Sequence, residues 1–151
     1  MKTLIINGGT IEDAFALSYI ERVKPDCILA ADRGMEFCYR NQIKPDVILG
    51  DYDSADKTIL EAFRRQSGIE WHQYQPEKDY TDSEIAIGKA MERNSSEIHI
   101  LGGTGTRLDH VLGNIQLLMQ PLAKDIPCFL IDSHNRIRLL KARTILQKSQ
   151  Q

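Results

Sequence analysis

The chain has 151 residues, enough for one domain with a sizeable core, and its 42% hydrophobic and 26% charged residues are typical of an ordinary globular protein. A formal net charge of −2 with scattered basic residues argues against a general nucleic-acid binder, which works by neutralising phosphates. The three cysteines form no CxxC pair, and no apolar run is long enough for a signal peptide or a membrane span. We therefore expect reduced core thiols, no membrane and a cytoplasmic location.

Short β-branched runs alternate with longer segments of helical period along the chain. The runs predict strands at 3–7, 27–31, 47–49, 69–74, 97–101 and 128–131. Helical spacing between them predicts helices at 11–22, 35–41, 56–66, 82–93 and 108–120. This alternation predicts an α/β fold in which a mainly parallel sheet is flanked by helices in a Rossmann-like, three-layer arrangement.

The last predicted helix carries apolar residues at steps of three and four, so we expect that face to pack on the sheet. Those residues are Leu108, Val111, Leu112, Ile115 and Leu118. Asp109, Gly113 and Gln116 share a different face. Segments 135–141 and 144–146 read as short strands of a hairpin, and the polar tail after them is expected to fray.

One stretch of the chain echoes another. Segment 24–32 closely matches segment 44–51, and each is a proline-initiated turn leading into a buried strand that ends in an acid. Seen only twice, this echo indicates two similar helix-to-strand units and not a solenoid. It places Asp32 and Asp51 at equivalent strand ends.

Two carboxylates, Asp51 and Asp53, follow the apolar run 47–49 directly. Residues two apart on an extended segment project to the same side, so the like charges would repel unless a cation or proton lies between them. A divalent metal would stabilise this arrangement. An Asp/Ser/Gly cluster after a strand is also ordinary turn and N-cap chemistry, and both readings stay open here.

The residues that follow the predicted strands are nearly all acids or glycines. In an open parallel sheet, ligands bind at the carboxyl ends of the strands. These positions are Gly8, Gly9, Asp32, Asp51, Asp53, Asp79, Gly102, Gly103 and Asp132. Their convergence predicts a binding site at that edge of the sheet.

Segment 77–84 has a structural and a functional interpretation. Thr81 with Glu84 three residues later is a capping box, and Asp82 in the first turn suits the helix dipole. Capping does not explain Lys78 and Asp79, a cation and an anion just ahead of a helix start, where phosphate binds readily. We therefore expect a functional role for this segment as well.

Segment 101–110 is a glycine-rich turn between a strand and a helix. Its glycines let backbone N–H groups approach an anion, and the helix N-terminus adds positive potential. It lacks the Gly-Lys-Ser/Thr of the Walker pattern, and it does not match a Rossmann GxGxxG because Leu108 stands where glycine is required, so we expect another kind of phosphate loop. Arg107 can fork onto a phosphate or simply be solvated. Asp109 and His110 are adjacent on a helix and cannot form a catalytic dyad.

The remaining aromatic and imidazole side chains carry no catalytic prediction. His72, His99 and His134 lack the spacing of metal ligands, so we expect structural or surface roles. Trp71 and Tyr74 are expected to pack at a strand end.

Taken together and in this order, these motifs resemble those of bacterial-type thiamine pyrophosphokinases, over residues 1 to about 140. The segments that carry the resemblance are Ala31-Asp32-Arg33-Gly34, Gly50-Asp51-Tyr52-Asp53-Ser54, Lys78-Asp79-Tyr80-Thr81-Asp82, and Gly102-Gly103 through Arg107-Leu108-Asp109-His110. The resemblance implies transfer of a pyrophosphoryl group from ATP to the hydroxyl of thiamine, with Mg²⁺, in a homodimer whose active site lies between subunits. Such chemistry consists mainly of positioning and charge neutralisation.

The resemblance also implies roles for individual residues. Asp51, Asp53 and Asp82 would be the metal and substrate acids, and Asp32 and Asp109 would complete the catalytic acidic site. The residues implied in binding the nucleotide phosphates are Ser54, Lys78, Asp79, Thr81, Gly102, Gly103, Thr104, Thr106 and Arg107. An Asp would accept the proton of the hydroxyl, with Asp82 as the first choice.

The resemblance further implies a second, β-rich domain that supplies much of the thiamine pocket. We expect residues 1–133 to form the nucleotide-binding catalytic domain and 134–151 to lead toward that second domain, which the chain is expected to lack. Thiamine affinity and turnover would then be weakened. The alternatives are pyrophosphorylation of another alcohol, such as a hydroxymethylpterin, or a non-catalytic nucleotide-binding domain.

Overall fold

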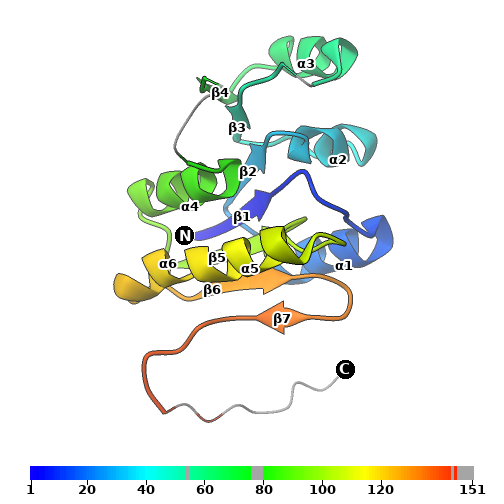
Figure 1. Ribbon diagram of the computed structural model, residues 1–151. Coiled ribbons are helices and arrows are strands. Elements are labelled where there is room, and N and C mark those ends of the chain that lie inside the picture. The colour runs from blue at the N-terminus through cyan, green and yellow to red at the C-terminus, as the bar shows by residue number, and fades with distance from the viewer. Residues whose placement is uncertain (54, 76–79, 144, 146–151) are drawn as a thin grey trace.

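The computed structural model describes residues 1–53, 55–75, 80–143 and 145, and the account below concerns these residues. They form one seven-stranded sheet with the strand order β4-β3-β2-β1-β5-β6-β7 (Figure 1). The strands are β1 (Lys2–Ile6), β2 (Cys27–Ala31), β3 (Val47–Gly50), β4 (Glu70–Gln73), β5 (Glu97–Leu101), β6 (Cys128–Ile131) and β7 (Arg136–Ile137). The helices are α1 (Asp13–Val23), α2 (Gly34–Arg40), α3 (Lys57–Arg64), α4 (Asp82–Glu92), α5 (Leu108–Leu117) and α6 (Met119–Ala123). The predicted α/β fold is confirmed.

Strands β1 to β6 pair in parallel, and β7 pairs antiparallel to β6 with Ile137 opposite Leu130. The predicted hairpin within 135–146 is wrong, because β7 pairs with β6 at the edge of the main sheet. Asp132 stabilises the turn between β6 and β7, since its carboxylate accepts hydrogen bonds from the N–H groups of His134 and Asn135, each at 2.7 Å. Residues 144 and 146, from the second strand of that hairpin, lie outside the described residues.

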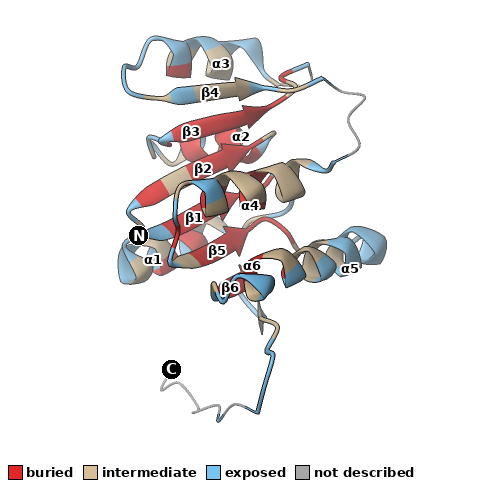
Figure 2. Cartoon of the chain, turned by 90° about the vertical axis from the view of Figure 1, so that its left-hand side faces the viewer, coloured by how far each residue is buried: buried red, intermediate tan, exposed pale blue. Residues whose placement is uncertain are grey.

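The sheet is buried on both faces, which explains the continuous apolar runs of its central strands. Leu4 and Ile6 of β1 belong to the core on the side of α1, α2 and α3, whereas Ile5 belongs to the core on the other face, with α4 and α5. The central strands are buried between helices whose outer surfaces are exposed (Figure 2). None of the described helices combines the length and apolar character needed to cross a membrane.

The echo between 24–32 and 44–51 has a structural basis. The Asp26 carboxylate accepts the backbone N–H of Lys2 at 2.7 Å, and the Asp46 carboxylate accepts that of Ile28 at 2.8 Å. The backbone N–H groups of Asp26 and Asp46 donate back to the carbonyls of these same two residues. Each repeated motif therefore fixes a strand to the start of its neighbour.

Helix α5 departs from the prediction in two ways. Leu108 and Leu112 are 68% and 57% exposed, so the expectation that both pack on the sheet is wrong, although Leu118 is buried. The predicted single helix is also interrupted at Leu118, and α6 begins at Met119. Pro121 explains the break, because a proline has no N–H to donate and is tolerated only in the first turn of a helix.

The connections of the sheet reverse direction next to β1. From β1 the chain moves outward through β2 and β3 to β4 on one side, then crosses back by α4 to β5 and continues outward to β6 (Figure 1). The ends of β1 and β5 therefore open into a crevice. Such a switch point is where doubly wound sheets bind their ligands.

Candidate active site

A cavity of about 950 Å³ lies at this switch point. Its walls are the turn after β1 (residues 7–10), the end of β2 at Ala31 and Asp32, the start of α4 (residues 81–84), the loop 102–107 and one face of α5. Segments far apart in the sequence thus converge at the carboxyl ends of β1, β2 and β5. The predicted location of the site at this edge agrees with the cavity.

Two of the glycines are needed for backbone packing. The N–H of Gly9 donates to the carbonyl of Gly102 at 3.0 Å, and a Cβ on Gly9 would come closer to that oxygen than non-bonded atoms allow. Gly102 has φ +71°, and a Cβ there would lie 2.5 Å from the carbonyl oxygen of Asn7. The turns after β1 and β5 therefore touch directly. In contrast, a Cβ on Gly105 would meet no atom of the described part of the chain within 4 Å.

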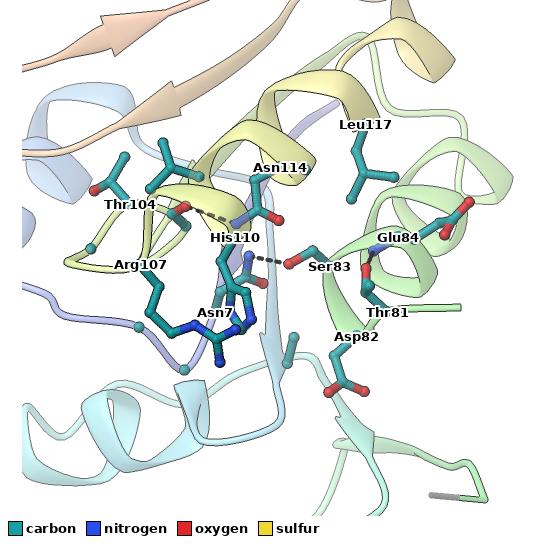
Figure 3. A pocket seen from close by; sticks show the side chains of 18 of the residues that line it. Asn7, Thr81, Asp82, Ser83, Glu84, Thr104, Arg107, His110, Asn114 and Leu117 are labelled. Atoms are coloured by element: carbon teal, nitrogen blue, oxygen red, sulfur yellow. Dashed lines mark hydrogen bonds between the residues drawn. The ribbon is translucent and has the colours of Figure 1, made fainter. Parts of the chain in front are cut away.

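Asn7 is a site residue that the sequence analysis missed. Its side chain, only 6% exposed, donates from Nδ2 to Ser83 Oγ at 2.8 Å and so joins β1 to the first turn of α4 (Figure 3). Its Oδ1 is buried and has no hydrogen-bond partner among the described residues. A polar residue closing the apolar run of β1 was the available signal.

The start of α4 confirms the half of the predicted capping box that Thr81 makes. Thr81 Oγ1 accepts the N–H of Glu84 at 3.2 Å, and Asp82 lies in the first turn and lines the cavity. The carboxylate of Glu84 accepts the side-chain N–H of Gln120 at 2.8 Å, which links α4 to α6. Lys78 and Asp79, predicted as phosphate-binding residues, lie outside the described residues.

Arg107 is the N-cap residue of α5, and it forks onto a carboxylate within its own helix. Its Nε and Nη2 donate to Asp109 at 3.2 and 2.7 Å, and these hydrogen bonds hold the pKa of Asp109 below its usual range. Both side chains are exposed, so the pair can open at little cost. Asn114 Nδ2 donates to the carbonyl of Gly103 at 2.7 Å, which fixes the loop to α5.

The segment after β3 forms a tight turn. Asp51 Oδ1 accepts the N–H of Asp53 at 3.0 Å, and Tyr52 between them has φ 64°. The Tyr52 hydroxyl donates to the carbonyls of Ile48 and His72 at 3.0 and 2.9 Å. The turn interpretation therefore accounts for much of the conformation of residues 51–53.

The cavity brings together only part of the predicted site. Its lining includes Thr81 and the catalytic candidates Asp32, Asp82 and Asp109, together with the loop residues Gly102, Gly103, Thr104, Thr106 and Arg107. Asp51 and Asp53 are not among the described lining residues, although β3 ends beside β2, where the N–H of Asp32 donates to Leu49 at 2.7 Å. Ser54 lies outside the described residues, and those that are described contain no group of three or more His, Cys, Asp or Glu side chains suited to hold a metal.

His99 and the cysteines are buried away from the cavity and have structural roles. His99 is buried, with Nδ1 2.7 Å from the Tyr19 hydroxyl and Nε2 2.6 Å from Glu97, and its burial lowers its pKa. Burial raises the pKa of Cys38 and of Cys128 to about 12, so neither thiol is a nucleophile at neutral pH. The expectation of core thiols is confirmed.

The fold and the cavity define the class of this protein as a doubly wound α/β protein with a ligand site at its topological switch point. A family model described as thiamin pyrophosphokinase, catalytic domain, matches residues 22–130. The chain therefore belongs to the thiamin pyrophosphokinase family, as the motifs suggested.

Individual relatives support the assignment. The thiamine pyrophosphokinase of Bacillus subtilis is 39% identical over 114 residues, which cover 74% of this chain and 51% of that protein. Thiamine pyrophosphokinase 2 of Arabidopsis thaliana is 35% identical over 88 residues, covering 54% of this chain and 33% of that protein. The crystal structure of the Bacillus subtilis enzyme superposes with a TM-score of 0.73 and 29% identity, covering 88% of this chain and 61% of that one. The chain thus spans about half the length of the first of these curated relatives.

Proposed function

We propose that the protein transfers the pyrophosphoryl group of ATP to the hydroxyl of thiamine, giving thiamine diphosphate and AMP. One observation carries the proposal: the cavity at the switch point combines Asp32, Asp82 and Asp109 with a glycine-rich loop and Arg107. This arrangement provides both oxygen ligands for a cation and N–H donors for phosphate. Family membership supplies the particular reaction.

The loop 102–106 and the start of α5 are the phosphate-binding elements in this proposal. Arg107 would exchange its exposed partner Asp109 for a phosphate, which accepts the same two-pronged hydrogen bond. Thr81, Thr104 and Thr106 can donate hydroxyl hydrogen bonds from the cavity wall. Ser54, Lys78 and Asp79 belong to the proposal through the matching motifs.

The side chains present fit Mg²⁺. This ion retains several waters and takes one or two carboxylates plus phosphate oxygens, so a cluster of three protein ligands is not required. One or two of the three acids that the motifs assign to the metal would hold it: Asp82 from the cavity wall, or Asp51 and Asp53 from the end of β3. When bound, Mg²⁺ neutralises charge on the phosphates of ATP.

The acidic residues also handle the proton of the attacking alcohol. Asp82 is partly buried at the start of α4 and lines the cavity, so it can accept the proton as thiamine attacks the β-phosphorus. Arg107 would stabilise the charge that collects on the departing AMP. The protein therefore acts mainly by orientation and by matching charge.

We also propose that the protein acts in the cytoplasm as a homodimer. The exposed apolar residues Leu108, Leu112 and Met119 on α5 and α6 are suited to an interface with a second copy. Light scattering on the protein as it elutes from a size-exclusion column is expected to give a mass near twice 17.2 kDa. A monomeric mass at micromolar concentration would refute this part of the proposal.

The reaction is tested by incubating the protein with ATP, Mg²⁺ and thiamine and measuring AMP. AMP formation that depends on thiamine supports the proposal, and a hydroxymethylpterin in place of thiamine tests for another acceptor. Release of ADP instead of AMP would overturn it. The double variant Asp51→Asn with Asp53→Asn tests the acids after β3, and unchanged binding of Mg²⁺ and ATP by this variant would refute their role in holding the metal.

A further inference from the structure

A glycine in the interior of α5 has no explanation in the packing of the fold. Gly113 lies at the sixth position of this helix, where glycine lowers helix stability relative to alanine. A Cβ added there would meet no atom of a described residue within 4 Å, so none of these neighbours requires the small residue. Gly113 does line the cavity. Its missing side chain therefore leaves space for a ligand.

The residues around Gly113 make a continuous wall. Asp109, Gln116 and Leu117 lie four before, three after and four after it, and all three line the cavity. Asp109, Gly113 and Gln116 share one face of α5, as their helical spacing predicts, and all three line the cavity. At the middle of this face the helix backbone is bare, and beside it stands the apolar side chain of Leu117.

A hydrogen-bonded polar pair also lines the cavity. Glu84 of α4 accepts the hydrogen bond from Gln120 of α6 at 2.8 Å, and both side chains line the cavity. Figure 3 shows Asn114 and Leu117 on the α5 side of the space, with Ser83 and Glu84 on the α4 side. A carboxylate accepts several hydrogen bonds, so Glu84 can take a further N–H donor from a ligand.

We propose that the face of α5 around Gly113 binds the planar 4-aminopyrimidine ring of a substrate, with the exocyclic amine of that ring directed to Glu84. The ring lies flat on the bare backbone and against Leu117, as planar heterocycles pack on apolar surfaces. Adenine and thiamine both contain this ring, so either substrate can supply it. The inference rests on the proposed function and assigns a substrate group to one part of its site.

The spacing along α5 suits such a ligand. A helix rises about 1.5 Å per residue, so Gly113 lies about 8 Å beyond Leu108, where the phosphate-binding end begins. One ribose, or the thiazolium ring and side chain of thiamine, fills a separation of this size. Phosphates at the N-terminus of α5 and a ring at Gly113 are therefore compatible in one ligand.

The test compares Gly113→Leu with a matched control, Gly88→Leu. Gly88 is interior to α4, also has open space around its Cβ position, and is not among the described cavity-lining residues. Binding of ATP, thiamine and inorganic tripolyphosphate is measured by calorimetry. Gly113→Leu is expected to weaken binding of the ring-bearing ligand at least about tenfold, whereas its tripolyphosphate affinity stays at the wild-type value. Gly88→Leu is expected to change neither.

The arms of this experiment separate the sources of the ring. A loss for ATP alone identifies adenine, and a loss for thiamine alone identifies the aminopyrimidine of the acceptor. Equal losses for ATP and tripolyphosphate, or unchanged affinity for both ATP and thiamine, would overturn the inference. Gly113→Ala serves as a second variant that preserves the helix, with an expected loss of about threefold.

A second readout concerns the amine. The variant Glu84→Gln is expected to lower by about tenfold the ratio between the affinity for the ring-bearing substrate and the affinity for its analogue without the amine. For ATP, that analogue is inosine triphosphate. An unchanged preference would contradict the role given to Glu84. These are binding measurements and do not depend on catalysis. A wild-type protein that binds ATP but forms no AMP would therefore refute the proposed reaction, and the binding of the ring at Gly113 would still be tested by the variants.

Discussion

The turn after β3 depends on one hydroxyl, and Tyr52→Phe removes it. Tyr52 is held at φ 64°, a left-handed conformation that costs a residue other than glycine roughly 1 kcal/mol or more. Its hydroxyl donates to the carbonyls of Ile48 and His72 at 3.0 and 2.9 Å, and its buried ring packs edge-on to Trp71 at 5.7 Å. These interactions offset the backbone strain between Asp51 and Asp53.

The expected magnitude follows from what the variant keeps. Phenylalanine retains the ring contact with Trp71 and loses only the hydroxyl, whose single proton is shared between the buried carbonyl of Ile48 and the partly buried carbonyl of His72, for a net contribution of about 1 to 2 kcal/mol. For a chain of this length that corresponds to a fall in Tm of roughly 2 to 8 °C. Burial raises the pKa of Tyr52 to about 12, so the loss is expected to be constant between about pH 6 and 9.

Urea unfolding followed by circular dichroism measures this loss. The control is Tyr39→Phe, since Tyr39 is 44% exposed and its hydroxyl has no hydrogen bond to another described residue. The control is expected to change the free energy of unfolding by less than about 0.5 kcal/mol. If Tyr52→Phe were as stable as the control variant, the hydroxyl would not be what holds the turn.

Three further predictions concern charge, backbone packing and catalysis. The hydrogen bond with His72 holds the pKa of Glu70 to about 2 against an ordinary 4.5, so the folded carboxyl adds stability above pH 4.5 that is lost as the pH falls toward 2. Glu70→Gln should therefore lower the urea midpoint at pH 7 and match wild type near pH 2; a gap independent of pH would contradict this. Gly9→Ala places a Cβ against the Gly102 carbonyl and should destabilise the fold by about 1 to 3 kcal/mol in thermal melts, whereas an unchanged Tm would show that the two turns can separate freely. Asp82→Asn should remain folded, with at most a small fall in Tm from the lost helix-dipole interaction, and should reduce AMP formation by at least about 100-fold; activity within threefold of wild type would remove Asp82 from the mechanism.

Much of the fold was predictable from local sequence signals. The predicted bounds of β2, β5 and β6 agree with the structure, because β2 and β6 are apolar runs of five and four residues and β5 is rich in isoleucine and leucine. The cap at Thr81 was also predictable, since a capping box is a local pattern. Features determined by a few neighbouring residues could therefore be predicted from the sequence.

Features that depend on distant parts of the chain were not predictable in this way. Helical spacing identifies the apolar row of α5 but not which part of it a neighbouring element covers, so the exposure of Leu108 and Leu112 was missed. Asn7 was missed because its partner Ser83 is 76 residues away. The space left by Gly113 likewise becomes evident only when α4 and α5 are seen to face each other across the cavity.

The most direct test of the proposed reaction follows the β-phosphate of ATP. With ATP labelled at the β-phosphorus, Mg²⁺ and thiamine, the account predicts that the label moves to the thiamine product while unlabelled AMP accumulates. Attack at the γ-phosphorus would instead leave the label in ADP. Label recovered in ADP, with none on thiamine, would contradict pyrophosphoryl transfer by this protein.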